Sequence, residues 1–257
     1  MSFETFLLEE NSKNSSEIIP IIYKNKKYWI KKARATFSSK LHKFYYTFFP
    51  FEVLLPVKNK TAKEAMFYET SKIEKFKEYG VNTPQVVFKN EEFFVLEDCG
   101  KTVNSYIRKK DISKEKIYYF IDKLLMELSK IHNHNDFHGG AQARNFTYYE
   151  GKIFTIDLED SFEDNIDLKL LQFRDFLLLL LSFTKTRASF QLDYRYIIDK
   201  YISLTNNNDF KNRLIKLANK ISFLIFLSDI KLINKLLGRD VKSFFKLFKL
   251  FKLLKNL

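Results

Sequence analysis

Glycine is scarce in this chain, and the first glycine comes late. Only six of the 257 residues are glycine, and none precedes Gly80. Loops that hold phosphate with successive backbone N–H groups, of the Walker or the dinucleotide-binding type, need several glycines because the backbone must approach the ligand closely. Residues 1–79 therefore exclude both types of loop. With 46% hydrophobic residues, the chain has enough apolar material for one large domain or a two-lobed one.

The N-terminal part, residues 1–98, predicts strands and one helix. Short apolar runs separated by turn residues predict β-hairpins over 18–33 and 86–96. Between them, apolar residues at helical spacing predict a helix over 61–79, which begins at the spacing of a capping box and ends before Gly80. We therefore expect the order β-β-α-β-β.

The C-terminal part, residues 99–257, predicts helices around one polar island. No proline follows Pro84, and the island, residues 136–160, contains a strand-turn-strand pattern around Gly151. A small β-rich lobe followed by a larger helical lobe gives an α+β fold. The helical patterns cover 102–109, 114–132, 167–185, 191–204 and 209–236.

The net charge of +13 is concentrated near the C-terminal end. From Lys200 onward there are 13 Lys or Arg and three Asp or Glu. Either a lysine-rich bias of the whole chain or a functional basic tail over 241–257 explains this. The tail lysines recur every third residue, which spreads charge around a helix, so docking on an anionic membrane and packing against the helical lobe both stay open. We do not expect nucleic acid as a partner, since no recognised binding module is present.

Cysteine content and hydropathy bear on the compartment. The single cysteine, Cys99, excludes a disulfide framework and a multi-cysteine zinc site. No segment reaches the roughly 18 apolar residues of a membrane span, and residues 1–4 lack the basic start of a signal peptide. We expect a cytoplasmic protein, with peripheral contact to the inner face of the membrane through the tail.

Polar residues of the island are typical of phosphoryl transfer. His138 and Asn145 stand seven residues apart, and Asp157 follows twelve residues later at the end of an apolar strand. Phosphoryl transfer depends on positioning and charge neutralisation, and Mg²⁺ prefers oxygen ligands. This segment resembles the catalytic and metal-binding loops of the protein-kinase-like superfamily. The resemblance implies a two-lobed kinase-like fold, ATP as the nucleotide, and Mg²⁺ held by Asn145 and Asp157.

The resemblance also implies a lysine–glutamate pair at the nucleotide phosphates. Lys31 stands where the family's phosphate-binding strand lysine would be, with Lys32 as the alternative. Glu69 on the predicted helix would pair with it, and Glu64 is the competing choice. Without a glycine-rich loop, the phosphate contacts would fall to these lysines and the metal.

Two more matches follow in the expected order along the chain. The segment from Glu97 to Cys99 resembles the adenine-binding hinge, where backbone groups of these two residues would meet the base. Asp175 resembles the buried aspartate that braces the catalytic loop. Within the superfamily, the segments 80–84 and 96–100 look most like the lipopolysaccharide core (Kdo and heptose) kinases and related Ser/Thr-kinase-like proteins. This implies transfer of the ATP γ-phosphate to a hydroxyl of an inner-core sugar or of a protein.

The chain departs from the family pattern at one central position. Gly140 stands two residues after His138, where the family has its catalytic aspartate. Asp136 and Gln142 are the candidates to replace that aspartate, by accepting the hydroxyl proton or by orienting the hydroxyl. A missing general base costs roughly 10²–10⁴-fold in rate. The alternative function is therefore a pseudokinase that binds nucleotide or acts as a scaffold.

Overall fold

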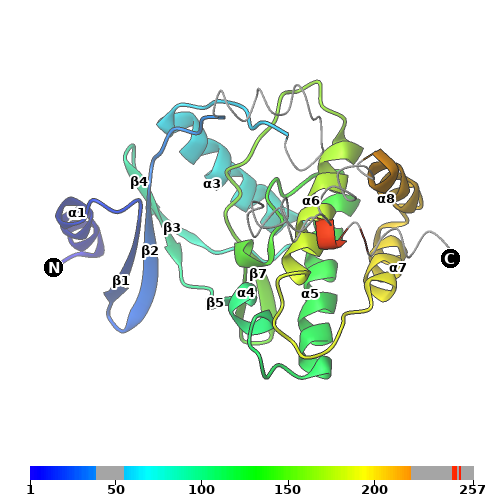
Figure 1. Ribbon diagram of the computed structural model, residues 1–257. Helices are drawn as coiled ribbons and strands as arrows, with labels where there is room; N and C mark the ends of the chain where they lie inside the picture. The colour runs from blue at the N-terminus through cyan, green and yellow to red at the C-terminus, as the bar shows by residue number, and fades with distance from the viewer. Residues whose placement is uncertain (39–54, 221–244, 248, 250–257) are drawn as a thin grey trace, which may run out of the picture.

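The computed structural model describes residues 1–38, 55–220, 245–247 and 249. The predicted α+β class is confirmed: an antiparallel sheet with a long helix forms the N-terminal part, and helices dominate the C-terminal part. Figure 1 shows the sheet on one side of the molecule and most helices on the other.

Both predicted hairpins are present in one antiparallel sheet of order β1-β2-β4-β3. Lys24 and Asn25 have positive φ and turn the chain between the first two strands. In the centre of the sheet, Lys31 of β2 lies opposite Phe94 of β4. The strands are β1 (Ile18–Tyr23), β2 (Lys26–Lys32), β3 (Val86–Lys89) and β4 (Phe93–Glu97).

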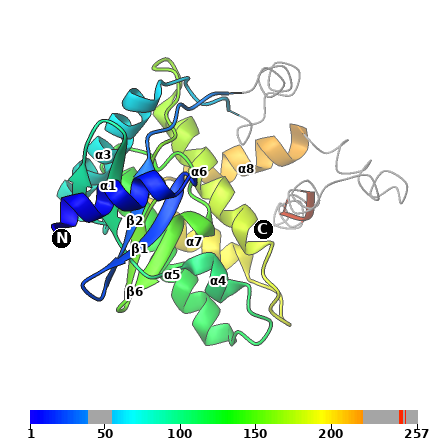
Figure 2. The same ribbon diagram turned by 90° about the vertical axis from the view of Figure 1, so that its left-hand side faces the viewer.

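A helix that the sequence did not predict, α1 (Phe3–Lys13), lies across one face of this sheet (Figure 2). The Ser2 hydroxyl caps its first turn, and its fully buried residue, Leu7, packs with apolar residues of β1, β2 and β4. Its apolar residues lie between Phe3 and Leu8 and span fewer than two turns, and such a short pattern does not distinguish a helix from other structures.

The long N-terminal helix is α3 (Ala62–Glu78). Thr61 and Glu64 form the capping box that their spacing predicts, and the φ of +69° at Gly80 allows the chain to leave the helix. Its buried face includes Glu69 and Lys72. Two charged side chains on a buried face need partners, and these lie in the candidate site.

The C-terminal part is built around two long helices, α5 (Lys114–Asn133) and α6 (Leu168–Phe183), which share a large hydrophobic core. The predicted strand-turn-strand is β6 (Phe146–Tyr149) and β7 (Lys152–Thr155), and a short strand, β5 (Lys101–Thr102), which was not predicted, extends it. The further helices are α4 (Val103–Ile107), η2 (Ala143–Asn145), α7 (Tyr194–Thr205) and α8 (Asp209–Lys220).

Two predictions reach past the described residues. The helix predicted over 209–236 is described to Lys220, and of the tail over 241–257 only 245–247 and 249 are described. Leu247 is fully buried in the core of the C-terminal part. At this residue the tail therefore packs against the helical part. No helix among the described residues is both long and apolar enough to cross a membrane.

A second hydrophobic cluster joins the two parts. Met66, Ile73 and Phe76 of α3 pack with Ile131 of α5 and with Leu158, which follows β7. The division at residues 98 and 99 stays a prediction, because this cluster extends across it.

Candidate active site

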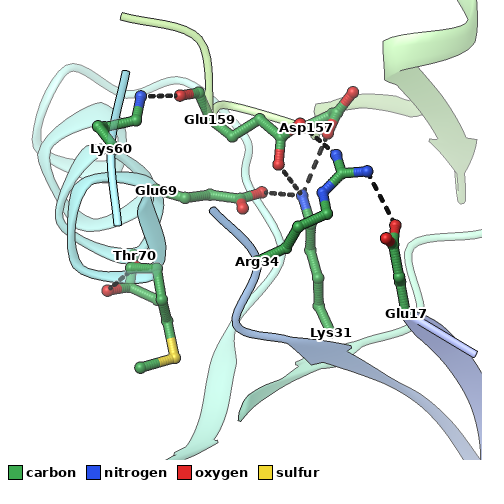
Figure 3. A network of polar contacts seen from close by, with 9 residues as sticks. Glu17, Lys31, Arg34, Lys60, Glu69, Thr70, Asp157 and Glu159 are labelled. Atoms are coloured by element: carbon green, nitrogen blue, oxygen red, sulfur yellow. Dashed lines mark hydrogen bonds and ion pairs between the residues drawn. The ribbon is translucent and has the colours of Figure 1, made fainter. Parts of the chain in front are cut away.

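Four charged side chains meet where β2, α3 and the segment after β7 converge (Figure 3). The Lys31 Nζ lies 2.8 Å from the Glu69 Oε1, 3.1 Å from the Asp157 Oδ1 and 3.4 Å from the Glu159 Oε2. The side chains of Lys31 and Glu69 are 14% and 4% exposed, whereas that of Asp157 is 44% exposed. One end of the cluster is therefore buried, and the Asp157 end is open to a ligand.

Burial and charge act in opposite directions on Lys31. Burial would lower the pKa of Lys31, but Glu69, Asp157 and Glu159 raise it above its usual value. Burial also raises the pKa of Glu69, and the Lys31 charge opposes that shift. Lys31 therefore stays protonated and can neutralise an anionic ligand at neutral pH.

The structure also distinguishes between the alternative lysines and glutamates. The Lys32 Nζ donates to the backbone carbonyls of Asn11 and Asn14, at the end of α1 and just after it. Glu64 accepts from the Thr61 N–H and hydroxyl in the capping box. Lys32 and Glu64 are thus bonded elsewhere, whereas Lys31 pairs with Glu69.

The loop after α5 is held by one buried carboxylate. Asp175 of α6 accepts the His138 N–H at 2.6 Å and the Gly139 N–H at 3.0 Å. Its pKa is lowered, because His132, His138 and Arg174 and its hydrogen bonds outweigh the burial that would raise it. The conformation of the loop is thus set from inside the C-terminal core.

His138 is a structural member of this loop. The side chain is fully buried, its Nδ1 accepts the Gly140 N–H at 3.2 Å, and burial lowers its pKa to about 4. A neutral, buried imidazole orients the backbone at Gly140 and has no route to a substrate proton.

Asn145 and Asp157 are adjacent through the backbone, since the Ile156 N–H donates to the Asn145 carbonyl at 3.0 Å. The Asn145 amide nitrogen donates a hydrogen bond to the Gly140 carbonyl at 2.8 Å. The amide oxygen of Asn145 is therefore the atom that can bind a cation. Asp157 has a left-handed backbone, with φ of 62°, that presents its carboxylate at the open end of the cluster.

These two oxygen donors suit Mg²⁺, which takes one or two protein ligands and completes its shell with phosphate oxygens and water. Among the described residues, no group of three or more His, Cys, Asp and Glu side chains is arranged to hold a metal ion by itself. A metal at Asn145 and Asp157 would therefore depend on ligand oxygens.

The candidates for the missing aspartate differ in their contacts. Asp136 forms an ion pair with Lys75 of α3 at 2.8 Å and accepts the Phe137 N–H. Gln142 immediately precedes η2, and its backbone carbonyl accepts the Asn145 N–H at 2.7 Å. Asp136 is thus engaged with α3, and Gln142 acts here through its backbone.

The predicted hinge is well anchored. Asp98 accepts the Trp29 indole N–H at 2.7 Å and pairs with Lys27 at 3.0 Å. The Glu97 N–H donates to the Gln85 carbonyl, and burial raises the pKa of the Cys99 thiol to about 12. The thiol is therefore inert, and any role of Glu97 and Cys99 rests on their backbone groups.

Arg34 and Glu159 also contact the cluster, and no sequence motif marks either residue. Arg34 NH2 lies 2.9 Å from the Glu159 Oε1, and its NH1 lies 2.8 Å from the Glu17 Oε2. The signal for Glu159 was its spacing of two residues from Asp157. Nothing local in the sequence links Arg34 to either partner.

No family model matches this chain. A Haemophilus influenzae (strain ATCC 51907 / DSM 11121 / KW20 / Rd) protein, described only as an uncharacterized protein, is 27% identical over 158 residues, which are 61% of this chain. The chain thus spans 59% of the length of that relative.

The solved structures similar to this chain include two aminoglycoside phosphotransferases. APH(2'')-Ib, ADP-bound, is 12% identical, with 96% of this chain and 97% of that chain covered and a TM-score of 0.39. APH(2'')-IIa, in a complex with gentamicin, is 11% identical, with 96% and 98% covered and a TM-score of 0.40. Similarity at this level assigns neither a family nor an activity to the chain.

Proposed function

We propose that the protein is a kinase-like phosphotransferase that moves the ATP γ-phosphate to a hydroxyl group. The observation that carries the proposal is the Lys31 cluster: a buried lysine, oriented by Glu69, beside the exposed carboxylate of Asp157. Lys31 would contact a polyphosphate without a glycine-rich loop, because its ammonium group is fixed before the ligand arrives, and Mg²⁺ at Asp157 would offset the charge of the neighbouring carboxylates.

Each residue has one task in this proposal. Lys31 binds the phosphates, and Glu69 keeps its ammonium group in place. Asn145 and Asp157 hold Mg²⁺, which supplies charge neutralisation at the phosphate oxygens. The backbone of Glu97 and Cys99 contacts the base.

The proposed acceptor class rests on one pocket of the structure. A pocket of about 640 Å³ lies between α3 and the segment after Asp160, with Lys58 and the rings of Tyr68, Phe137 and Phe162 in its lining. Aromatic rings can stack on a sugar ring, and the polar side chains of the lining can bind its hydroxyl groups, so we propose an inner-core sugar of lipopolysaccharide ahead of a protein hydroxyl. Phosphate transfer to de-acylated inner core, compared with transfer to a generic protein substrate, separates the two.

The decisive experiment is nucleotide binding followed by turnover. We expect ATP to raise the thermal midpoint, more so with Mg²⁺, and ADP to be released. Asp157→Ala should abolish the Mg²⁺-dependent part, whereas Asp164→Ala, at a 94% exposed side chain, should not. No stabilisation in either condition would refute the proposal and leave a scaffold. Stabilisation without turnover would favour the pseudokinase, for which Gly140 is the motivating observation.

The membrane contact of the tail is a separate proposal. The basic residues of 241–257 would bind an anionic surface, although Leu247 is buried. Removal of 241–257 should reduce co-sedimentation with anionic vesicles but not with neutral ones. Unchanged binding to anionic vesicles would reject this role.

A further inference from the structure

The two consecutive glycines of the loop make room for one particular side chain, Asp160. Gly139 has φ of +99°, and a Cβ at this position would lie 2.9 Å from both the Cβ and the carbonyl oxygen of Asp160. A Cβ on Gly140 would lie 3.5 Å from the Asp160 Oδ2 and 3.3 Å from the Asn145 amide nitrogen. The absence of side chains at both positions therefore lets Asp160 approach the loop.

Asp160 also differs from the other acidic groups nearby in having no partner committed to it. No described residue donates a hydrogen bond to its carboxylate or forms an ion pair with it, and the side chain is half-buried. By contrast, Asp157 and Glu159 contact Lys31, and Asp136 contacts Lys75. Arg174 and Lys60 lie close enough to act on Asp160 electrostatically.

We propose that Asp160 supplies, from the segment after β7, the carboxylate that Gly140 lacks, and that it contacts the acceptor hydroxyl as a catalytic residue. The inference rests on the proposed function, and it depends on the space shared by Gly140 and Asp160. The Asp160 carboxylate and the Asn145 amide both lie next to Gly140.

The step balances with the groups named. The Asp160 carboxylate accepts the hydrogen bond of the acceptor hydroxyl and takes its proton as the hydroxyl oxygen bonds to the γ-phosphorus. The bond between the γ-phosphorus and the β,γ-bridging oxygen breaks, and ADP leaves with that electron pair. Asp160 then releases the proton to water.

The first test needs no activity. Gly140→Asp places a second carboxylate against Asp160, so we expect it to lower the urea-unfolding midpoint more in the wild-type background than in Asp160→Asn. Gly140→Asn has nearly the same size without the charge, and its effect should be equal in both backgrounds. Equal effects of Gly140→Asp in the two backgrounds would overturn the inference.

The second test is turnover, measured as ADP release from Mg²⁺-ATP with water as the acceptor. Asp160→Asn should reduce it roughly 10²–10⁴-fold, with the ATP-dependent thermal shift retained, whereas Glu91→Gln, at an 85% exposed side chain between β3 and β4, should leave it unchanged. Gly140→Asp added to Asp160→Asn should restore part of the rate.

Three outcomes of the second test would overturn the inference: wild-type turnover in Asp160→Asn, loss of its nucleotide binding, or no recovery in the double variant. A wild-type protein that binds no nucleotide would instead refute the proposed function, while the stability comparison would still decide whether Asp160 shares the space of Gly140.

Discussion

Lys31 and Lys72 are both buried, but their surroundings shift their pKa values in opposite directions. Lys31 faces three carboxylates, and its pKa is raised. Lys72 of α3 donates to the His138 carbonyl at 3.1 Å and lies over the ring of Phe137, and burial lowers its pKa to about 8 despite more distant carboxylates. Burial alone thus does not decide the charge of a lysine; carboxylates in direct contact do.

The difference separates a binding region from a structural one. The Lys31 cluster holds several charges that an anionic ligand can rearrange. The Lys72 region holds one cation between a backbone carbonyl and aromatic rings, where a charge is costly.

Substitution of Asp175 is expected to change the stability most. The negative charge of Asp175 also favours the protonated form of Lys72. Asp175→Ala leaves two backbone N–H groups and the buried Arg174 without their carboxylate. We expect the free energy of unfolding to fall by about 3–5 kcal/mol, measured by urea denaturation. Asp164→Ala serves as the exposed control, and a loss as small as its own would contradict the role of Asp175 as the brace of the loop.

Lys31→Met should have the next largest effect, because Glu69 is then buried without its partner. We expect a loss of about 3 kcal/mol in unfolding free energy and no ATP-dependent thermal shift. Adding Glu69→Gln should recover part of the stability but none of the shift. Lys32→Met is the matched control, since Lys32 contacts backbone carbonyls near the end of α1. A normal ATP response in Lys31→Met would show that Lys32 or another cation holds the phosphates.

Lys72→Met should instead stabilise the protein. The folded pKa of about 8 lies below the ordinary 10.5, so the folded state binds fewer protons between these values and stability rises with pH across that window. Below pH 8 the full cost, about 3 kcal/mol, is present. We expect a gain of about 2 kcal/mol at pH 7 after the lost hydrogen bond, and a flatter dependence between pH 8 and 10.5. A less stable variant, or an unchanged slope, would contradict the comparison.

Arg34→Met should have the smallest effect. The Arg34 and Glu17 side chains are 51% and 61% exposed, and such ion pairs contribute less than about 1 kcal/mol. The change should shrink further at high ionic strength, measured by urea denaturation at two salt concentrations. A larger, salt-independent loss would mean that Arg34 belongs to the buried end of the cluster.

The sequence predicted elements whose signals are local. The hairpins, α3 with its capping box, and the helices of the C-terminal part follow from short-range patterns. In α1 the apolar residues are confined to Phe3–Leu8, and β5 has only two residues, so neither gives such a pattern. The sequence also held an unused clue: Glu64, already required by the capping box with Thr61, was not free to pair with Lys31.

The rest depended on contacts between distant segments. Lys31 and Lys32 point to opposite faces of β2, and only the packing of α1 and α3 shows which face is the site. The approach of Asp160 to Gly140 depends likewise on how the segment after β7 folds back onto the loop. Neither leaves a periodic signal in the sequence.

The lysines of α3 and α5 also determine how the molecule could deform. Lys72 and Lys75 of α3 bond to His138 and Asp136, and Lys130 of α5 bonds to the Gly80 carbonyl at the end of α3. Helix α3 is therefore bonded to the C-terminal part as well as to the sheet, which it contacts through Glu69 and Thr70. A displacement of the sheet away from α3 would lengthen the Lys31–Glu69 ion pair, so the length of this pair would report such a separation.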